Sequence, residues 1–364
     1  MNTTPDKTEI LNWLCETNAA RLEELWRAAD ETRRSRVGDA VHLRGLVEIS
    51  NHCSRQCGYC GLRAGNRALG RYRMDAGEIF ASALQAVKFG YGTVVLQAGE
   101  DYGITAAWMA EVVRRIKSET PLAVTLSLGE RTDAELAAWR EAGANRYLLR
   151  FETSDRALFD AIHPPLGNRP CDRIKILRRL QALGYEAGSG IMVGIPGQTY
   201  ASVADDIALF GELDLDMIGI GPFIPHPAPP LGNGNKISPS ANGEQVPNTE
   251  LMVYKAVALT RLMRPDANIP ATTALATINK TSGRELGLQR GANVFMPNLT
   301  PVKYRKLYEI YPDKACIAET DEACNGCLGL RIKKIGRHVG VGAGGRRRQK
   351  IIAEPPAEKE LHHA

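Results

Sequence analysis

Three closely spaced cysteines constrain this chain more than any other feature of its sequence. Cys53, Cys57 and Cys60 form the pattern C-x3-C-x2-C directly after the apolar residues 46–49, which predict a strand. The cysteines therefore lie in a loop at the C-terminal end of that strand. Thiolates at such short spacings can hold three irons of a 4Fe–4S cluster. The fourth iron then has no cysteine, so a small molecule can bind there and accept an electron.

Two other interpretations of these cysteines remain open at this point. They can be three unrelated thiols, or they can belong to a structural zinc site. Zinc prefers four ligands, usually arranged as two pairs, whereas this loop offers three cysteines. The aromatic Tyr59 before the third cysteine is also similar to the signature of the radical S-adenosylmethionine (SAM) superfamily. We therefore favour the iron–sulfur interpretation.

The composition fits a soluble enzyme of one or two domains. Of the 364 residues, 44% are hydrophobic and 24% are charged, which is ordinary for a globular protein. No apolar run approaches the roughly 20 residues that a membrane span needs. The N-terminus lacks the basic and apolar regions of a secretory signal. Eight cysteines without such a signal indicate a reducing compartment and metal binding, so we expect a cytoplasmic protein.

Positive charge is concentrated near the C-terminus. Residues 331–350 contain eight Lys or Arg and no acidic residue. A basic segment of this kind can contact nucleic acid or an acidic protein. The simpler interpretation is a solvated end of the chain, which we favour, and we do not expect a nucleic-acid partner.

Short apolar segments alternate with helical patterns from residue 43 onward. The predicted strands are 43–50, 93–98, 122–128, 146–151, 187–193, 217–221, 268–273 and 293–296. The predicted helices lie within 7–36 and at 75–89, 105–117, 132–142, 172–183, 199–213 and 249–263. Alternating units imply a parallel sheet, and eight of them imply an α/β fold of the (βα)8 TIM-barrel type. Chemistry is expected at the C-terminal ends of the strands.

The same patterns divide the chain into four parts. Residues 1–42 form an N-terminal helical segment, 43–300 the barrel, 301–348 a C-terminal extension, and 349–364 a flexible tail. A proline-rich loop at 225–248 follows the end of a predicted strand. Long loops inside a compact domain are usually functional or disordered, and we expect this one to cover the barrel mouth.

Polar residues occur where several predicted strands end. Gly99 allows a close approach of the backbone to a ligand, and the neighbouring Glu100 can accept a hydrogen bond from an ammonium group. Thr125 can place its hydroxyl on the cavity wall, while Arg150 and Glu152 share one face of their strand. Each of these has a plain structural alternative, namely a turn, filling of the barrel, or an ion pair.

A second group of cysteines lies beyond the last predicted strand. Cys316, Cys324 and Cys327 form the pattern C-x7-C-x2-C. Three thiols at this spacing favour a metal site, either an accessory iron–sulfur cluster or a zinc. We expect it to lie away from the central chemistry. Cys171 has no cysteine nearby and is interpreted as a structural thiol.

Roughly residues 20–348 resemble the HydE-type maturases of FeFe-hydrogenase, a branch of the biotin synthase-type radical SAM family. The matching runs are CSRQCGYCGLR at 53–63, RYRM at 71–74, VLQAGED at 95–101, VTLSLGE at 124–130, YLLRFET at 147–153, MVGIPGQT at 192–199, IGIGPFIPHP at 218–227, IPATTA at 269–274 and GANVFMPN at 291–298. The runs GIGPFIPHP and VTLSLGE are far more specific than the cysteine triad, which the whole superfamily shares.

The resemblance implies a role for each matching residue. Cys53, Cys57 and Cys60 would hold the catalytic cluster, and the C-terminal cysteines match an accessory cluster of some members. The remaining roles fall into two sets: Tyr59, Gln97, Gly99, Glu100, Glu152 and Arg173 would contact SAM, and Arg44, Thr125, Tyr308 and Tyr311 would line the substrate cavity. Phe151 stands where the family is expected to have histidine, and we expect this departure to alter the pocket wall.

The implied activity is reductive cleavage of SAM to methionine and a 5′-deoxyadenosyl radical. The radical would act on an iron complex carrying cysteine, carbon monoxide and cyanide, during assembly of the di-iron subcluster of the hydrogenase. A reductant such as flavodoxin or ferredoxin and the other hydrogenase maturases would be partners. Three alternatives remain: a HydE-like paralogue with another small-molecule substrate, like biotin synthase or methylornithine synthase; a non-catalytic iron–sulfur carrier; and a nucleic-acid-modifying enzyme, which rests on the basic segment alone.

Overall fold

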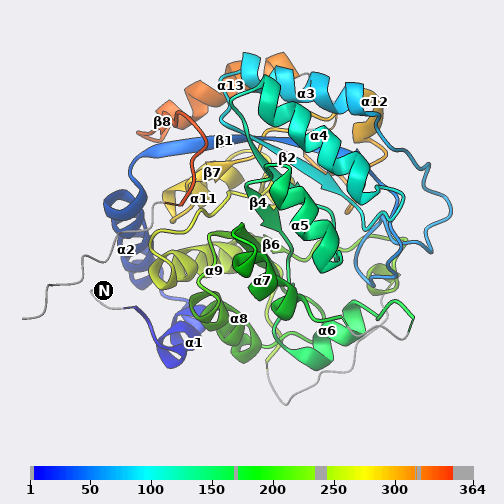
Figure 1. Ribbon diagram of the computed structural model, residues 1–364. Coiled ribbons are helices and arrows are strands. Elements are labelled where there is room, and N and C mark those ends of the chain that lie inside the picture. The colour runs from blue at the N-terminus through cyan, green and yellow to red at the C-terminus, as the bar shows by residue number, and fades with distance from the viewer. Residues whose placement is uncertain (1–3, 168–170, 234–243, 316, 318–320, 347–364) are drawn as a thin grey trace, which may run out of the picture.

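Parallel strands form the framework of the computed structural model (Figure 1), which describes residues 4–167, 171–233, 244–315, 317 and 321–346. The long ones are β1 (Ala40–Ser50), β2 (Thr93–Ala98), β3 (Ala123–Ser127), β4 (Arg146–Leu148), β5 (Glu186–Val193) and β6 (Met217–Pro222). Each is paired in parallel with the next one along the chain. β7 (Val294–Phe295) and β8 (His338–Val339) both pair with β1. The predicted parallel α/β fold is confirmed.

Short pairings complete the ring where a seventh long strand was expected. Asn268 pairs with β6, and Pro270 pairs with β7. The predicted strand at 268–273 is therefore wrong in extent. Pro270 has no N–H to give to a ladder, and the Thr272 side chain caps the N-terminus of α10 (Thr273–Ile278).

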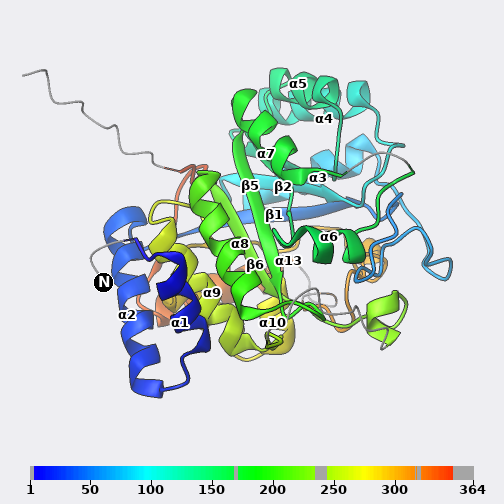
Figure 2. The ribbon, with the colours of Figure 1, turned by 90° about the horizontal axis from the view of Figure 1, so that it is seen from below.

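Amphipathic helices cover the outside of the strands (Figures 1 and 2). The predicted helices are present with small shifts at their ends: α1 (Lys7–Cys15), α2 (Ala19–Val37), α3 (Ala76–Lys88), α4 (Ala106–Glu119), α5 (Asp133–Glu141), α7 (Arg173–Ala182), α8 (Tyr200–Glu212) and α9 (Glu250–Met263). Sequence patterns missed α6 (Arg156–Ile162), α10, α11 (Gly283–Gln289), α12 (Val302–Arg305), α13 (Asp321–Lys334) and the short η1 (Pro230–Asn233). In the described part of the chain, every helix is too short or too polar to cross a membrane.

The inside of the barrel is incompletely filled and carries some polar side chains. Val94 and Leu96 of β2 are fully buried in the core, whereas Gln97 lines a central cavity. This alternation follows the period of two along a strand. Gly219 and Gly221 of β6 also line the cavity. Because these positions carry no side chain, space remains for a ligand where many barrels are packed with branched residues.

The end of the described chain crosses the N-terminal ends of the strands. The Ala343 carbonyl accepts hydrogen bonds from Thr93 Oγ1 at 2.9 Å and from Arg146 Nη2 at 3.0 Å. The Gly344 carbonyl accepts from Arg44 Nη2 at 3.0 Å and from Asn268 Nδ2 at 3.1 Å. These donors come from β1, β2, β4 and the 268–270 segment, so the C-terminal segment ties this end of the barrel together.

Arg346 fixes this segment to the barrel through three carboxylates. Its guanidinium lies 2.9 Å from Asp214, 3.2 Å from Asp216 and 2.8 Å from Asp266, and its side chain is only 7% exposed. Arg337 is also buried and pairs with Asp30. The interpretation of the basic segment as a solvated end is therefore wrong for these two arginines.

Replacing Arg346 with Ala should lower the free energy of unfolding by about 2 kcal/mol, because the buried Asp216 loses a charged hydrogen-bond partner and the segment loses its attachment to Asp214 and Asp266. Lys334→Ala removes the same charge from an exposed position of α13 and should change stability little. Urea unfolding followed by circular dichroism would measure both. Equal stability of the two variants would contradict the structural role of Arg346.

Candidate active site

A cavity of about 340 Å³ extends through the barrel from the cysteine loop to Arg44 near the N-terminal end of β1. All the residues predicted to act in catalysis or to bind SAM line it, with the exception of Gly99: Arg44, Cys53, Cys57, Tyr59, Cys60, Gln97, Glu100, Thr125, Glu152, Arg173, Tyr308 and Tyr311. The sequence predictions thus converge on one site. Their individual contacts with a ligand stay predictions.

Gly99 has a different place, directly behind the cysteine loop. A Cβ atom at this position would lie 2.2 Å from the His52 carbonyl oxygen and 2.8 Å from Cys53 Cβ. Glycine is therefore required here for the close approach of the β2 end to the loop. The loop is fixed at this edge because the Ser54 N–H donates to the Glu100 carbonyl at 2.9 Å.

Among the three cysteines of the loop, Cys57 is buried, and Cys53 and Cys60 are half-buried. Cys57 is 7% exposed, and the described cysteines form no disulfide. Burial raises the pKa of all three thiols, that of Cys60 to about 12, and the Cys57 and Cys60 thiols are raised further by their cysteine neighbours. Three cysteine thiols lining one cavity are the donor type that holds iron–sulfur clusters, so the donor set fits such a cluster.

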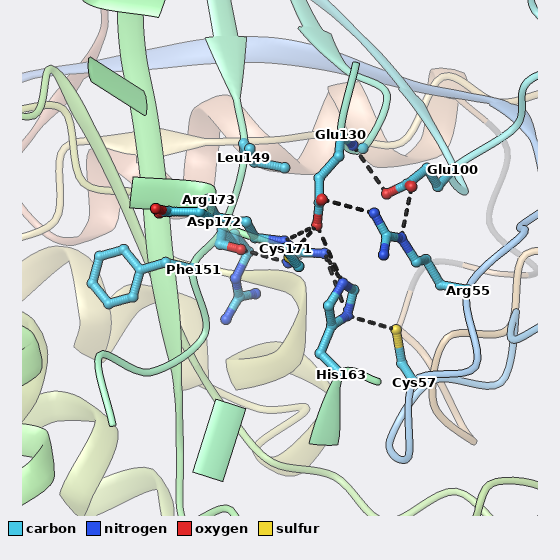
Figure 3. A network of polar contacts seen from close by, with 12 residues as sticks. Arg55, Cys57, Glu100, Glu130, Leu149, Phe151, His163, Cys171, Asp172 and Arg173 are labelled. Carbon is cyan, nitrogen blue, oxygen red and sulfur yellow. Dashed lines mark hydrogen bonds and ion pairs between the residues drawn. The ribbon is translucent and has the colours of Figure 1, made fainter. Parts of the chain in front are cut away.

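The loop is also held by two buried ion pairs (Figure 3). Arg55 Nε donates to Glu100 Oε1 at 2.6 Å, and Arg55 Nη2 lies 2.7 Å from Glu130 Oε2. Tyr102 donates its hydroxyl to Glu100 Oε1, and the backbone N–H of Glu130 donates to Glu100 Oε2 at 3.0 Å. Both carboxylate oxygens of Glu100 therefore have protein partners. Its predicted contact with SAM would have to share these oxygens.

Glu130 is the centre of a second set of contacts that reaches Cys57 (Figure 3). Its Oε1 accepts from the Cys171 thiol at 2.6 Å and from Arg173 Nε at 3.0 Å. His163 lies between Glu130 and Cys57, with Nε2 3.3 Å from Glu130 Oε1 and Nδ1 3.0 Å from the Cys57 sulfur. Although burial raises the pKa of Glu130, these partners outweigh it and hold the pKa well below its usual range.

The Glu130, His163 and Cys171 side chains lie close enough to hold a metal ion, but their surroundings argue against it. Arg173 and Arg55 already contact Glu130, so two guanidinium groups neutralise the carboxylate and a metal ion is not needed for charge balance. Cys171 donates its thiol hydrogen to Glu130, and burial, followed by the Glu130 charge, raises its pKa to about 12. The interpretation of Cys171 as a structural thiol thus fits its place in this network.

Glu152 presents its carboxylate to the cavity from an unusual backbone conformation. Its φ of 64° lies in the left-handed region that side-chain-bearing residues rarely adopt, and such strain concentrates at functional sites. Glu152 Oε2 lies 3.1 Å from Arg150 Nη2, so the ion-pair interpretation of these two residues also applies.

Phe151 does not form part of the cavity wall, contrary to expectation. Its ring is 1% exposed and packs against Phe210 of α8, with ring centroids 5.5 Å apart. Figure 3 shows it directed away from the Glu130 contacts. Its neighbours in sequence, Arg150 and Glu152, line the cavity, whereas the Phe151 side chain packs on the helix side of the chain.

The deep part of the cavity offers hydrogen-bond donors without protein partners. Arg44 Nε and Thr125 Oγ1 are buried and have no hydrogen-bond partner among the described residues. Above them, Gln97 Nε2 donates to the Tyr308 hydroxyl at 3.2 Å. Lys314 forms a buried ion pair with Glu48 and donates to the Tyr308 carbonyl at 3.1 Å. The C-terminal extension therefore forms part of the cavity wall.

The structure adds functional candidates that no sequence pattern indicated. Arg55 lies inside the cysteine loop, and Glu130 ends the run VTLSLGE. Both residues belong to recognised motifs, but the sequence predicted no role for either of them. His163 and Lys314 belong to no motif, and only their contacts distinguish them. In the accessory group, Cys316 and the Cys324 side chain are not described, while Cys327 is an exposed residue of α13.

Asp206 of α8 positions the loop that follows Glu152. It is fully buried, and its Oδ1 accepts from the Ser154 N–H at 2.5 Å, from the Ser154 hydroxyl at 2.6 Å and from Thr153 Oγ1 at 3.3 Å. Burial raises the pKa of Asp206 to about 7, because the hydrogen bonds only partly compensate for the lost hydration.

Sequence comparisons place the chain among known enzymes. Residues 47–210 match the model of the radical SAM superfamily. The chain is 47% identical to the FeFe-hydrogenase maturase subunit HydE of Thermotoga maritima, over 90% of this chain and 89% of that protein. It is 28% identical to 3-methylornithine synthase of Methanosarcina acetivorans, over 75% of this chain and 73% of that protein.

Solved structures agree with this fold. Methylornithine synthase superposes with a TM-score of 0.75 at 24% identity, covering 93% of this chain and 94% of that one. The FeFe-hydrogenase maturase HydG from Carboxydothermus hydrogenoformans superposes with a TM-score of 0.71 at 17% identity, covering 91% of this chain and 75% of that one. At such identities the likeness concerns the fold alone.

Asp206→Asn should make the free energy of unfolding less dependent on pH. Since the folded-state pKa of Asp206 is raised, the wild type binds an extra proton in the folded state between about pH 4 and pH 7 and loses stability as pH rises through this window. The loss is about 1.4 kcal/mol per unit of pKa shift, and Asn has no such proton to lose. Urea unfolding at pH 6 and pH 8 would show this, and equal pH dependence in both proteins would contradict it.

Proposed function

Since this chain belongs to the HydE family of FeFe-hydrogenase maturases, within the radical SAM superfamily, we propose that it acts in assembly of the di-iron subcluster of the hydrogenase. It is a radical SAM enzyme. The proposed substrate is an iron complex carrying cysteine, carbon monoxide and cyanide. The observation that carries the proposal is the convergence of three thiols, Glu152 and the free donors of Arg44 and Thr125 on one cavity.

Cys53, Cys57 and Cys60 would hold a 4Fe–4S cluster at the mouth of this cavity. When bound, the cluster supplies the electron that cleaves SAM to methionine and a 5′-deoxyadenosyl radical, and the electron comes from a reductant such as flavodoxin or ferredoxin. The protein's part is to bind, orient and exclude water. Tyr59 supports this, because it packs against an apolar cluster that includes Leu158 and Leu231 and so closes the wall beside the cysteines.

The residues proposed for SAM differ in how freely they can bind it. The Glu152 carboxylate lines the cavity and can accept from ribose hydroxyls, and Gln97 can contact the methionine end. Arg173 uses all three guanidinium nitrogens on protein partners: Nε on Glu130, Nη1 on the Arg150 carbonyl and Nη2 on His163. We propose that Arg173 and Glu100 act mainly by fixing the cysteine loop beside SAM, and that Gly99 allows the loop to lie there.

The deep end of the cavity suits a substrate that carries acceptor atoms or negative charge. Arg44 is held by the Gly344 carbonyl and by the Met217 sulfur, which leaves Nε for a ligand. Thr125 Oγ1 can donate beside it. Cyanide and carboxylate groups accept hydrogen bonds of this kind, and a charged donor strengthens them. Tyr308 and Tyr311 would form the side wall.

Beyond the barrel, the proposal extends to an accessory site and to partners. Cys316, Cys324 and Cys327 would hold a second iron–sulfur cluster or a zinc. The other hydrogenase maturases would supply or receive the iron complex, and we place the reaction in the cytoplasm. The methylornithine and biotin synthases are more distant, at 28% and 27% identity. A non-catalytic carrier would need the cysteines but no strained Glu152 aimed into the cavity.

Replacing Cys57 with Ala should remove most of the catalytic iron and all reductive cleavage of SAM, because only two of the thiolates that would hold the cluster remain. Cys327→Ala, which changes an exposed cysteine of the extension, should keep SAM cleavage. The measurement is anaerobic: reconstituted protein, dithionite and SAM, with 5′-deoxyadenosine determined by mass spectrometry. Full cleavage by the Cys57 variant would refute the cluster assignment, and complete loss in the Cys327 variant would contradict the accessory role.

A further inference from the structure

His163 lies directly behind Cys57, one of the three cysteines of the loop. It follows α6, whose last residue, Ile162, accepts a hydrogen bond from the Gly58 N–H of the cysteine loop at 2.7 Å. The imidazole is fully buried, and its Nδ1 lies 3.0 Å from the Cys57 sulfur. The contact is therefore built into the attachment of the loop to α6.

The partners of the ring decide which nitrogen carries the proton. An iron-bound thiolate can only accept a hydrogen bond, so Nδ1, which lies 3.0 Å from the Cys57 sulfur, carries a hydrogen when the cluster is bound. On the other side of the ring, Nε2 lies 3.3 Å from Glu130 Oε1. Arg173 Nη2 lies 2.9 Å from Nε2 and 3.4 Å from Nδ1, so it lies beside both ring nitrogens and holds the ring in place.

We propose that His163 is a positioning residue for the cluster ligand Cys57, and that its Nδ1–H donates to the thiolate and makes the cluster easier to reduce. Hydrogen bonds to ligand sulfurs are among the factors that set iron–sulfur potentials, since they stabilise the extra negative charge of the reduced state. The inference rests on the cluster proposed above. Glu130 and Arg173 would act through His163 by holding its ring in place.

Cys53 and Cys57 have different hydrogen-bond donors. Cys53 faces a backbone donor, the Glu100 N–H, at 3.4 Å. Cys57 faces a side-chain donor at 3.0 Å, and that donor is backed by an arginine. A side chain can be replaced without changing the backbone, so the contribution of His163 can be measured by substitution.

The test uses three variants of the full chain, reconstituted anaerobically. His163→Leu removes the donor, whereas His163→Asn returns an amide N–H close to the place of Nδ1. Phe159→Leu is the matched control. The Phe159 ring packs on the His163 ring, with centroids 5.1 Å apart, but it takes no part in the hydrogen bond between His163 and Cys57. The midpoint potential of the cluster is measured by redox titration followed by electron paramagnetic resonance (EPR), without SAM. Iron content is measured alongside.

The expected result is a more negative midpoint potential in His163→Leu, a return toward the wild-type value in His163→Asn, and no shift in Phe159→Leu. A wild-type potential in His163→Leu would overturn the proposal, as would equal shifts in the Leu and Asn variants or an equal shift in the Phe159 control. If the wild type itself shows no 4Fe–4S signal, the proposed function fails before the variants are compared.

A second measurement uses the wild-type fold and so does not depend on the stability of the Leu variant. Protein labelled with nitrogen-15 in histidine should show a nitrogen hyperfine coupling to the reduced cluster in pulsed EPR. The coupling should disappear from His163→Asn labelled in the same way, which separates His163 from His52 beside Cys53. Absence of the coupling in the wild type would overturn the hydrogen bond to Cys57.

Discussion

The ion pairs between the cysteine loop and the barrel are the constraint on which the site depends. A loop with three thiols has no fixed shape of its own, and here Arg55 joins it to Glu100 after β2 and to Glu130 after β3. All three side chains are nearly inaccessible to solvent, so removing Arg55 would leave Glu100 as a buried charge without its cation, at a cost of about 3–5 kcal/mol. The thiols can therefore converge before any metal is bound.

The charges of this region are balanced, which explains why it can be buried. Glu100 and Glu130 face Arg55 and Arg173, so the network itself adds little net charge beside the thiols. The opposite end of the cavity is different. There Arg44 lines the cavity and donates to the Gly344 carbonyl of the C-terminal segment. A cavity with thiolates at one end and the Arg44 guanidinium at the other would orient an anionic substrate along the barrel.

Much of the fold could be predicted from sequence, because strands and helices each produce a hydrophobic pattern within a short stretch of residues. Caps such as Asp75 with Glu78 and Thr132 with Glu135 mark helix starts within a few residues. The cysteine loop and the polar strand ends were predictable for the same reason. The error at Phe151 arose from treating a neighbour in sequence as a neighbour in the pocket. The strand at 268–273 failed because Pro270 and the cap at Thr272 outweigh its apolar pattern.

The rest of the site could not be predicted, because it is assembled from distant segments. Glu130, His163 and Cys171 come from three separate loops, and no local spacing links any of them to Cys57. The C-terminal segment is basic and rich in glycine, a composition typical of a solvated end. Only the tertiary structure shows Arg346 among Asp214, Asp216 and Asp266.

The central claim is that the three thiols leave one iron open and that SAM binds to it. The most direct measurement is the EPR spectrum of the reduced, anaerobically reconstituted protein before and after addition of SAM. Binding to the open iron changes the environment of the cluster, so the spectrum should shift when SAM is added. It should not shift when adenosine, which lacks the methionine part of SAM, is added instead. An unchanged spectrum at saturating SAM would contradict the claim.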